Sequence, residues 1–263
     1  MSGADRPPYG PAEEEPGVRV CTLGSGSAGN AALVEAPRGW ILVDAGFSWR
    51  ELRRRAGRMG VSLETVTTLL ITHEHTDHVR GLRSLLRRGV EVWASSGTLR
   101  ALGVPGNPLS GPQEILGLTV RPFRVPHDAA EPLGFRFELD GTSLVVATDL
   151  GTVNDGVQQA LAGATAVVLE ANHDLALLLG GPYPWHLKMR ILGPKGHLAN
   201  DAAGQALAPL ASQGLKAAFL AHISQENNTP ALALETVAQA LGDWDGRLYL
   251  TYPDRPSSVL SLA

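Results

Sequence analysis

Short apolar runs rich in valine, isoleucine and leucine recur along the chain and end in polar or glycine-containing turns, a pattern that predicts buried strands. Segments with apolar residues three or four positions apart lie between them and predict helices. Examples are Phe47 to Gly60 and the segment that begins at Pro230, because proline suits the first turn of a helix. The pair Asp140-Gly141 separates two strand-like runs and indicates a hairpin. The predicted strands are 18–23, 31–35, 40–43, 69–71, 91–94, 119–125, 135–139, 143–147, 166–169, 216–220 and, last in the chain, 247–251.

The predicted strands form two clusters, and helices follow each cluster. This order favours two mixed sheets packed face to face with helices outside both, an α+β sandwich. Residues 102–112 are rich in glycine and proline and predict a surface loop. We expect residues 1–17, which are polar and rich in proline and glutamate, to form a disordered tail. The remainder, 18–263, is expected to form a single domain.

The composition is that of an ordinary soluble globular protein, with 44% hydrophobic and 18% charged residues in a chain of 263. No apolar run approaches the roughly 20 residues that a membrane span needs, so we expect no membrane partner. The one cysteine, Cys21, lies in an apolar strand-like run, which excludes an internal disulfide and indicates a buried, unreactive thiol. Together these features predict a cytoplasmic protein.

Positive charge is concentrated in one part of the sequence. The net charge of −4 argues against a generic polyanion-binding protein, but residues 50–100 contain ten arginines against five acids. Two interpretations stay open. The arginines form either a solvated helix face or a basic rim that attracts phosphate.

The densest group of possible metal ligands follows the fourth predicted strand, where three histidines and two acids fall within six residues. Imidazole and carboxylate are ligands that zinc and manganese prefer. His73 and His75 alternate by two, so in extended backbone they project to the same side and can bind one ion. Asp77 and His78 begin a predicted helix and can bind a second ion beside the first. An N-cap role for Asp77 would account for one acid and for none of the histidines.

Three more potential ligands, His127, Asp149 and His222, each follow a predicted strand. A lone histidine in such a place is more often structural, but a metal motif elsewhere in the same chain favours the ligand role. Asp149 has two carboxylate oxygens and can bridge two ions, which would hold a hydroxide nucleophile between them. The predicted ligands are His73, His75 and His127 for one metal, Asp77, His78 and His222 for the other, and Asp149 between them.

Two polar features beside these ligands allow more than one interpretation. The loop from Gly24 to Asn30 is either a cradle that holds a phosphate on its backbone N–H groups or a plain glycine-rich hairpin. Asp44, at the end of another predicted strand, is either a turn former or a carboxylate that orients a metal-bound histidine.

The His-x-His-x-Asp-His motif at residues 73–78, together with the three strand-end ligands, resembles the metallo-β-lactamase superfamily from Val18 to the C-terminus. The resemblance implies an αββα four-layer sandwich. Five further segments are similar to the YycJ/WalJ branch of that superfamily, which is associated with DNA exonuclease activity. They are residues 23–30, 169–174, 181–185, 196–200 and 221–228. This chain has Ala28 and Ala199 where the branch usually has serine, so each of those loops lacks one hydroxyl.

The resemblance implies a two-metal phosphodiesterase that acts on nucleic acid, foremost a DNA exonuclease in the 5′-to-3′ direction, with a metal-bridging hydroxide as nucleophile. It implies two divalent ions, manganese or zinc, and no obligate protein partner. In related tRNA-processing enzymes a glutamate orients a general-acid histidine, and Glu170 and His197 match these positions. A structural role for this pair, and for His173, stays open. The expected catalytic residues are Asp77, Glu170 and His197, and the expected substrate-binding residues are Ser25, Ser27, Asn30, His173 and Asn200.

Two other functions remain compatible with the sequence. One is a thioester or other small-molecule hydrolase of the same superfamily, since Asp149 as a bridging ligand does not exclude it. The other is a non-enzymatic protein in which the metals are structural and the arginine-rich surface docks nucleic acid or protein.

Overall fold

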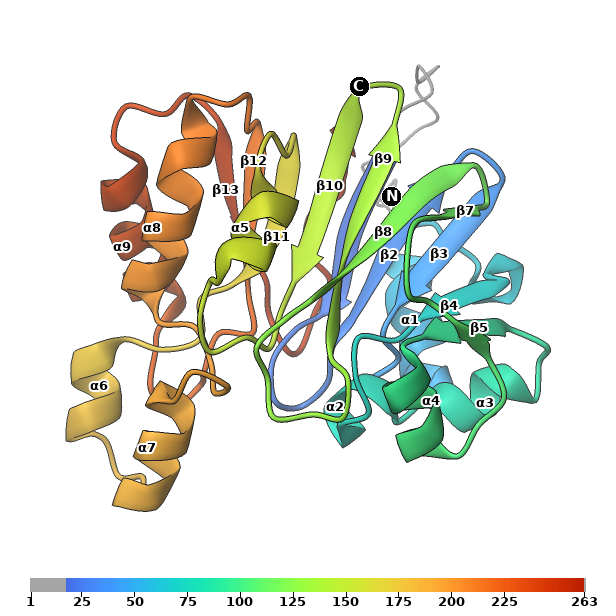
Figure 1. The fold of residues 1–263 in the computed structure, drawn as a ribbon, viewed down its shortest axis with the longest axis horizontal. Coiled ribbons are helices and arrows are strands. Elements are labelled where there is room, and N and C mark those ends of the chain that lie inside the picture. The colour runs from blue at the N-terminus through green and yellow to red at the C-terminus, as the bar shows by residue number, and fades with distance from the viewer. Residues whose placement is uncertain (1–17, 263) are drawn as a thin grey trace, which may run out of the picture.

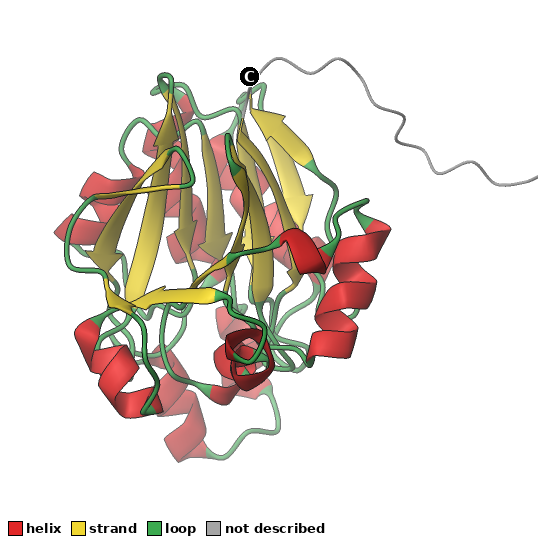
Figure 2. Cartoon of the chain, turned by 90° about the vertical axis from the view of Figure 1, so that its right-hand side faces the viewer, coloured by secondary structure: helices red, strands yellow, loops and turns green. Residues whose placement is uncertain are grey.

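The computed structural model describes residues 18–262, so the tail predicted for residues 1–17 lies outside the described part of the chain. Two seven-stranded sheets pack face to face, and helices cover both outer sides (Figures 1 and 2). This is the predicted α+β sandwich, and the prediction of its fold class is confirmed.

The first sheet has the strand order β14-β1-β2-β3-β4-β5-β6. Its antiparallel part joins β14, β1, β2 and β3, and the pairs from β3 to β6 are parallel. The strand β1 therefore runs in the same direction as β3 and β4. The bounds are β1 Val18–Gly24, β2 Ala31–Ala36, β3 Gly39–Val43, β4 Thr68–Leu70, β5 Glu91–Ala94, β6 Asn107–Pro108 and β14 Leu260–Leu262.

The second sheet has the order β13-β12-β11-β10-β9-β8-β7. The pairs from β7 to β10 are antiparallel and those from β10 to β13 are parallel, so β8, β10, β11 and β12 share one direction. Asp140 and Gly141 both have positive φ and close the predicted hairpin between β9 and β10. The bounds are β7 Gln113–Ile115, β8 Leu118–Arg124, β9 Leu133–Leu139, β10 Thr142–Ala147, β11 Ala166–Glu170, β12 Ala217–Ala221 and β13 Arg247–Leu250.

Helices complete the outer layers by burying one apolar face each. Leu52 and Leu85 pack on the outer side of the first sheet, and Val157, Leu207 and Val237 pack on the outer side of the second. The bounds are α1 Trp49–Arg58, the 3₁₀ turn η1 Leu63–Thr65, α2 Thr76–Val79, α3 Leu82–Leu86, α4 Ser96–Leu102, α5 Asp155–Leu161, α6 Leu175–Gly180, α7 Trp185–Leu192, α8 Asn200–Ala211 and α9 Pro230–Leu241.

The core between the two sheets is built by alternate residues of each strand. Phe135 and Phe137 project inward from β9 and are fully buried, as is Phe219 of β12, whose ring stacks on that of Tyr249 at a centroid distance of 4.6 Å. Because the strand period is two, the intervening residues face the outer helices instead. The sheets therefore have apolar residues on both faces, as continuous hydrophobic strands predict.

Two sequence predictions of secondary structure are wrong. Strand 247–251 is not the last, because β14 follows it and pairs with β1 at the far end of the chain. Residues 102–112 are not wholly a loop, since β6 lies within them. The strand β7 was not predicted either. The three missed strands, β6, β7 and β14, have at most three residues, and each is defined by its partner strand rather than by a local apolar pattern.

The predicted helix after residue 77 also differs, since it is divided into α2 and α3. Gly81 lies at the break, where a Cβ would come within 2.5 Å of the carbonyl oxygen of Phe47. The close approach of two backbones therefore requires glycine here and turns the chain between the two short helices.

The helices α6 and α7 form a hairpin that projects from the lower edge of the sandwich in Figure 1. Lys188 is buried and its ammonium group donates to the carbonyl oxygens of Leu179 (2.6 Å) and Gly181 (2.8 Å), which ties the two helices together. Within the described residues, the exposed large hydrophobic side chains all belong to this hairpin. They are Leu175, Leu177, Leu179, Trp185 and Met189.

No helix within residues 18–262 is both long enough and apolar enough to cross a bilayer.

Truncation of the inter-sheet core should measurably destabilise the fold. We expect Phe137→Ala to lower the free energy of unfolding by about 3–5 kcal/mol, because it removes a buried aromatic ring and leaves a cavity. Chemical denaturation of the metal-free protein measures this change. Leu175→Ala, at an exposed site, is the matched control and should change stability by no more than about 0.5 kcal/mol. Equal effects of the two variants would contradict the described packing.

Candidate metal centre

The seven predicted metal ligands, which the sequence scatters over residues 73–222, all lie at one edge of the sandwich. His73 and His75 follow β4, while His127, Asp149 and His222 follow β8, β10 and β12. Because the strands of each sheet that lead to these residues run in the same direction, their carboxyl ends meet at the same edge. The fold therefore brings together side chains up to 149 positions apart (222 − 73) in the sequence.

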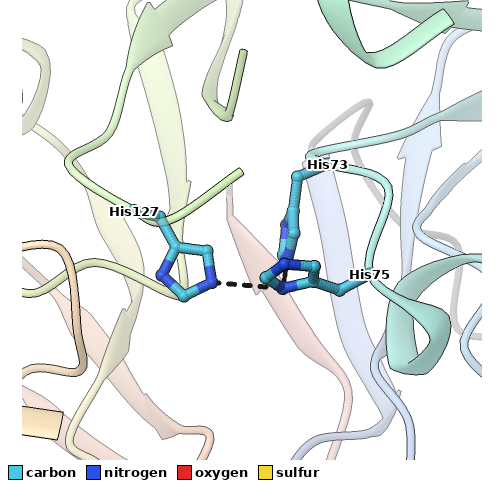
Figure 3. Close-up of side chains that lie close together, drawn as sticks. All are labelled: His73, His75 and His127. Atoms are coloured by element: carbon cyan, nitrogen blue, oxygen red, sulfur yellow. Dashed lines mark hydrogen bonds between the residues drawn. The ribbon is translucent and has the colours of Figure 1, made fainter. Parts of the chain in front are cut away.

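Three histidines direct ring nitrogens toward a common point (Figure 3). His73 Nε2 lies 3.0 Å from His75 Nδ1, which in turn lies 3.4 Å from His127 Nε2. The three rings meet edge to face rather than in stacks. Such a group of nitrogen lone pairs is favourable when a cation sits among them, and it fits the three-histidine face expected for one metal.

The other predicted ligands form a second group beside the first. His78 Nε2 lies 3.2 Å from Asp149 Oδ2 and 3.6 Å from Asp77 Oδ2, and His222 Nε2 lies 3.9 Å from the same oxygen of Asp77. Asp149 belongs to both groups, since one of its oxygens also lies near His73 and His78. Its position therefore suits a ligand shared by two ions.

In four of the five predicted histidine ligands, the outward nitrogen has an oxygen partner that orients the ring. Because the proton is held on that outward nitrogen, the inward nitrogen keeps the lone pair that a metal requires. This arrangement fits a metal centre better than a network of plain hydrogen bonds. The four contacts are His73 Nδ1 to Thr72 Oγ1 (3.0 Å), His78 Nδ1 to Asp44 Oδ2 (2.8 Å), His127 Nδ1 to the carbonyl oxygen of Gly196 (3.2 Å) and His222 Nδ1 to Glu170 Oε1 (2.9 Å).

Two inward atoms lack hydrogen-bond partners within the described residues. His222 Nε2 and Asp149 Oδ2 are both buried, yet neither takes part in a well-aligned hydrogen bond. A buried polar atom without a partner is costly, so each such atom calls for a specific explanation. Divalent cations would satisfy both, and the donor set of imidazole nitrogens and carboxylate oxygens fits zinc or manganese.

Buried charge controls the protonation of the site. Burial opposes ionisation of Asp149, but His222 and His78 beside it hold the pKa of that carboxyl well below its usual range. Burial likewise opposes protonation of His78, but Asp149 and Asp44 raise the pKa of its imidazole well above the ordinary value. His73, which has less support from carboxylates, has its pKa lowered by burial and is neutral. The buried carboxylates thus demand positive charge in this space.

Three of the site residues have strained backbone. Asp44, Asp149 and His222 have φ values of 60°, 57° and 54°, in the left-handed region that non-glycine residues seldom adopt. Each follows a strand, and the left-handed turn redirects the chain at the point where the side chain must face the centre. Strain of this kind is concentrated at functional sites because the surrounding structure has to maintain it.

Asp44 is the orienting carboxylate that the sequence left as one of two alternatives. It accepts from the backbone N–H of Thr72 (2.8 Å) and from the Thr72 hydroxyl as well as facing His78. The hydroxyl of Thr72 faces His73, so one carboxylate orients histidines of both groups. Nothing in the sequence around Thr72 marked it for this role.

The loop from Gly24 to Asn30 supports the predicted metal ligands through hydrogen bonds. Ser25 Oγ accepts from the backbone N–H of His222 (2.8 Å), and the amide of Asn30 donates to Asp77 Oδ2 (3.3 Å). Both side chains are buried, whereas Ser27 is exposed and lines the adjacent cavity. The role predicted for these three residues in substrate binding stays a prediction.

Asn200 and His173 lie next to each other, since the backbone N–H of Asn200 donates to the carbonyl oxygen of His173 (2.9 Å). The side-chain amide of Asn200 is buried and pairs reciprocally with that of Asn228, at 3.0 and 2.9 Å. His173 is also buried, and neither of its ring nitrogens has a hydrogen-bond partner within the described residues. Their predicted contact with substrate stays a prediction. The sequence drew attention to the segment that contains Asn228 only through its resemblance to the family.

Glu170 and His197 form an ion pair at the rim of the metal groups. Glu170 is fully buried, and its Oε1 lies 2.7 Å from His197 Nδ1 while its Oε2 accepts from the backbone N–H of Leu150 (2.8 Å). Burial opposes the charged forms, but the pairing lowers the pKa of Glu170 to about 2 and raises the pKa of His197 to about 9. His197 is therefore held as an imidazolium with its Nδ1 fixed and its side chain 25% exposed.

The backbone before His197 is fixed by close packing on α7. A Cβ on Gly196 would lie 2.1 Å from the carbonyl oxygen of Ile191, so only glycine fits, and the N–H of His197 donates to that same oxygen (3.0 Å). The carbonyl of Gly196 in turn faces His127. A cavity of about 210 Å³ opens beside these residues, lined by His127 and His197 on one side and by α7 on another.

Removal of the shared carboxylate should release metal. We expect Asp149→Ala to lower the metal content by at least one ion per chain, because the substitution takes a carboxylate from both groups. Elemental analysis of protein purified without added chelator measures the content. The matched control is Asp155→Ala on the exposed start of α5, which should leave the content unchanged. Full occupancy in Asp149→Ala would exclude the bridging role.

Loss of the orienting carboxylate should weaken metal binding without removing a ligand. We expect Asp44→Asn to lower metal affinity about 10- to 100-fold, because the one amide oxygen cannot serve both the N–H of Thr72 and the ring of His78. If the oxygen accepts from Thr72, the amide nitrogen faces His78, where it cannot accept a proton. Competition with a calibrated chelator measures the dissociation constant. An affinity within twofold of wild type would show that the contact between Asp44 and His78 is dispensable.

The amino-acid sequence matches proteins of one family over most of its length. A beta-lactamase superfamily domain matches residues 39–223. The chain is 36% identical to exodeoxyribonuclease YycJ of Bacillus anthracis, covering 86% of this chain and 89% of that protein. It is 34% identical to exodeoxyribonuclease WalJ of Streptococcus pneumoniae, covering 94% of this chain and 99% of that protein.

A solved structure supports the fold independently of sequence. The metallo-beta-lactamase fold protein YhfI of Bacillus subtilis superimposes with a TM-score of 0.74 at 14% identity, over 94% of this chain and 100% of that one. At this level of identity the similarity concerns the fold alone.

Proposed function

The chain belongs to the beta-lactamase superfamily, in the branch that contains YycJ and WalJ, and on this premise we propose that it is a two-metal DNA exonuclease. It is a metal-dependent hydrolase, as the family predicts. The observation that supports exonuclease activity in particular is the ion pair between Glu170 and His197, at 2.7 Å, beside the group of predicted ligands. Such a pair suits the hydrolysis of a phosphodiester, whose leaving oxygen needs a proton.

Two divalent ions, manganese or zinc, fit the donor set. His73, His75 and His127 would hold one, and Asp77, His78 and His222 the other, with Asp149 shared between them. Such ions supply a nucleophilic hydroxide at neutral pH and neutralise negative charge on an attacked phosphate.

His197 supplies the proton for the leaving group. Its Nδ1 is held by Glu170, so Nε2 carries the proton that is free to move. As the water oxygen bonds to phosphorus, the bond from phosphorus to the leaving oxygen breaks, and that oxygen takes its electron pair and the proton of His197 Nε2. Asp77, whose carboxylate is partly exposed, accepts the proton that the water loses as it becomes the nucleophilic hydroxide.

The need for a proton donor distinguishes phosphodiester hydrolysis from thioester hydrolysis, the alternative reaction in the same superfamily. A thiolate leaves from a thioester without protonation, because thiols ionise near pH 8.5, whereas an alkoxide leaves poorly unless it is protonated. A buried glutamate that keeps His197 charged is therefore more useful to a phosphodiesterase than to a thioesterase. This comparison, together with relatives named exodeoxyribonucleases, favours DNA as the substrate.

We further propose the 5′-to-3′ direction, which is compatible with this chemistry. If the leaving oxygen is O3′ of the terminal nucleotide, that nucleotide departs with a free 3′ hydroxyl and the remaining strand keeps a 5′ phosphate. Each cleavage then leaves a 5′ end of the same kind as before, which allows digestion to continue.

DNA and RNA of one sequence, labelled at either end and incubated with manganese or with zinc, test the proposal on a gel. We expect stepwise shortening of DNA from its 5′ end. Hydrolysis of a thioester panel without any cleavage of nucleic acid would overturn the proposed function.

Loss of His197 should affect substrates according to their leaving groups. We expect His197→Ala to retain its metal and to lose about 100- to 10,000-fold in turnover of DNA, because the alkoxide leaves unprotonated. Hydrolysis of bis(p-nitrophenyl) phosphate, whose phenolate leaves readily, should fall less than tenfold. His186→Ala, at an exposed histidine of α7, is the matched control. Equal losses on both substrates would remove the assignment of His197 as general acid.

A further inference from the structure

The cavity beside His197 has two kinds of wall. Tyr183, Leu187 and Ile191 line it from the α6–α7 hairpin, and these side chains are aromatic or aliphatic. On other sides it is lined by polar groups, which include the hydroxyl of Ser224, the amide of Asn227 and the ion pair of Arg190 with Asp128. A flat apolar surface combined with hydrogen-bonding groups matches a nucleobase, which has an apolar face and a polar edge.

One of the amide groups at the cavity has an unsatisfied oxygen. Asn227 is 1% exposed, and its Oδ1 has no hydrogen-bond partner within the described residues. Its backbone N–H donates to Ser224 Oγ (3.1 Å) and its carbonyl accepts from Asp174, so the residue is held in place while the amide oxygen is unsatisfied. An N–H group on the edge of a base would supply the missing donor.

The size of the cavity limits what can enter. Its volume is about 210 Å³, below the roughly 300–1,000 Å³ of pockets that hold drug-sized ligands. One base with its sugar is of a suitable size, and two paired bases are too large. Because His197 lies in the wall, the group that occupies this space is the nucleoside that carries the leaving oxygen.

Resting on the proposed exonuclease function, we propose that this cavity binds the terminal nucleoside of an unpaired strand end, with its base stacked on Tyr183. The substrate is therefore a single-stranded or frayed terminus, and a paired end must open before it is cleaved. Two contacts fix the position of the hairpin. Lys188 joins α6 to α7, and the guanidinium group of Arg190 in α7 lies 2.6 Å from the carboxylate of Asp128, which is next to the predicted ligand His127.

Substrates that differ only in pairing at the end provide the first test. With manganese-loaded protein, we expect a single-stranded oligonucleotide to be digested at least tenfold faster than a blunt duplex closed by G·C pairs, because unpairing a base costs free energy. Mismatches at the terminal two positions of the same duplex should restore most of the rate. Equal rates on all three substrates would overturn the inference.

A double-substitution cycle between protein and substrate tests the role of Tyr183. We expect Tyr183→Ala to lower kcat/KM about tenfold on single-stranded DNA, mostly through KM, and an abasic terminal residue to cause a similar loss with wild type. The two losses should not add, because each removes the same stacking contact. Tyr183→Phe should restore the activity, and Met189→Ala, on the same hairpin but outside the cavity lining, is the matched control.

The outcomes separate the two proposals. If DNA is digested but the losses from Tyr183→Ala and the abasic residue multiply, the stacking site is wrong and the exonuclease function stands. If wild type cleaves neither DNA nor RNA, the proposed function fails, and the inference fails with it.

Discussion

Two buried carboxylates constrain the whole of this site. Asp149 and Glu170 are 2% and 0% exposed, and an ionised carboxylate in such surroundings is tolerated only beside positive charge. Histidines surround both groups, and the pKa of His78 and that of His197 rise in response. Two divalent cations would meet the same demand around Asp149, while His197 continues to balance Glu170. The carboxylates thus explain why cations and a protonated imidazole can coexist within one small space.

The sandwich satisfies this constraint through the direction of its strands. Strands that run the same way end at one edge, so each sheet delivers ligands to the same place without long loops. Individual residues then direct their side chains from the strand ends toward the centre. Positive φ at Asp44, Asp149 and His222 turns each side chain into the centre, and this strain is maintained by the packed strands on either side.

The hairpin of α6 and α7 contacts both the proposed proton donor and the proposed substrate cavity. The carbonyl of Ile191, in the last turn of α7, fixes the backbone of His197, and the carbonyl of Gly196 faces the predicted metal ligand His127. The same helix contributes a wall of the cavity into which the leaving nucleoside is proposed to fit. A single element therefore positions the proposed general acid, supports a predicted metal ligand and shapes the proposed substrate cavity.

The local sequence determined much of this picture because local physics governs it. Strand and helix periods predicted most elements, and the dense motif at residues 73–78 predicted a metal centre before any fold was known. The resemblance to the metallo-β-lactamase superfamily is confirmed by relatives that cover most of the chain. The very short strands β6, β7 and β14 were missed, because two or three residues are too few to show an apolar period.

Only the tertiary structure decided how the site is supported. The local sequence does not indicate the roles of Thr72, Gly196 and Asn228. A hydroxyl, a carbonyl or an amide occurs in many places, and its role depends on the hydrogen-bond partner that the fold puts beside it. The choice of Asp44 as an orienting carboxylate, and the cavity formed by Tyr183 and His197, likewise depend on contacts between segments far apart in the chain. Sequence periodicity reports which side of a strand or helix is buried, but it contains no information on which two surfaces will meet.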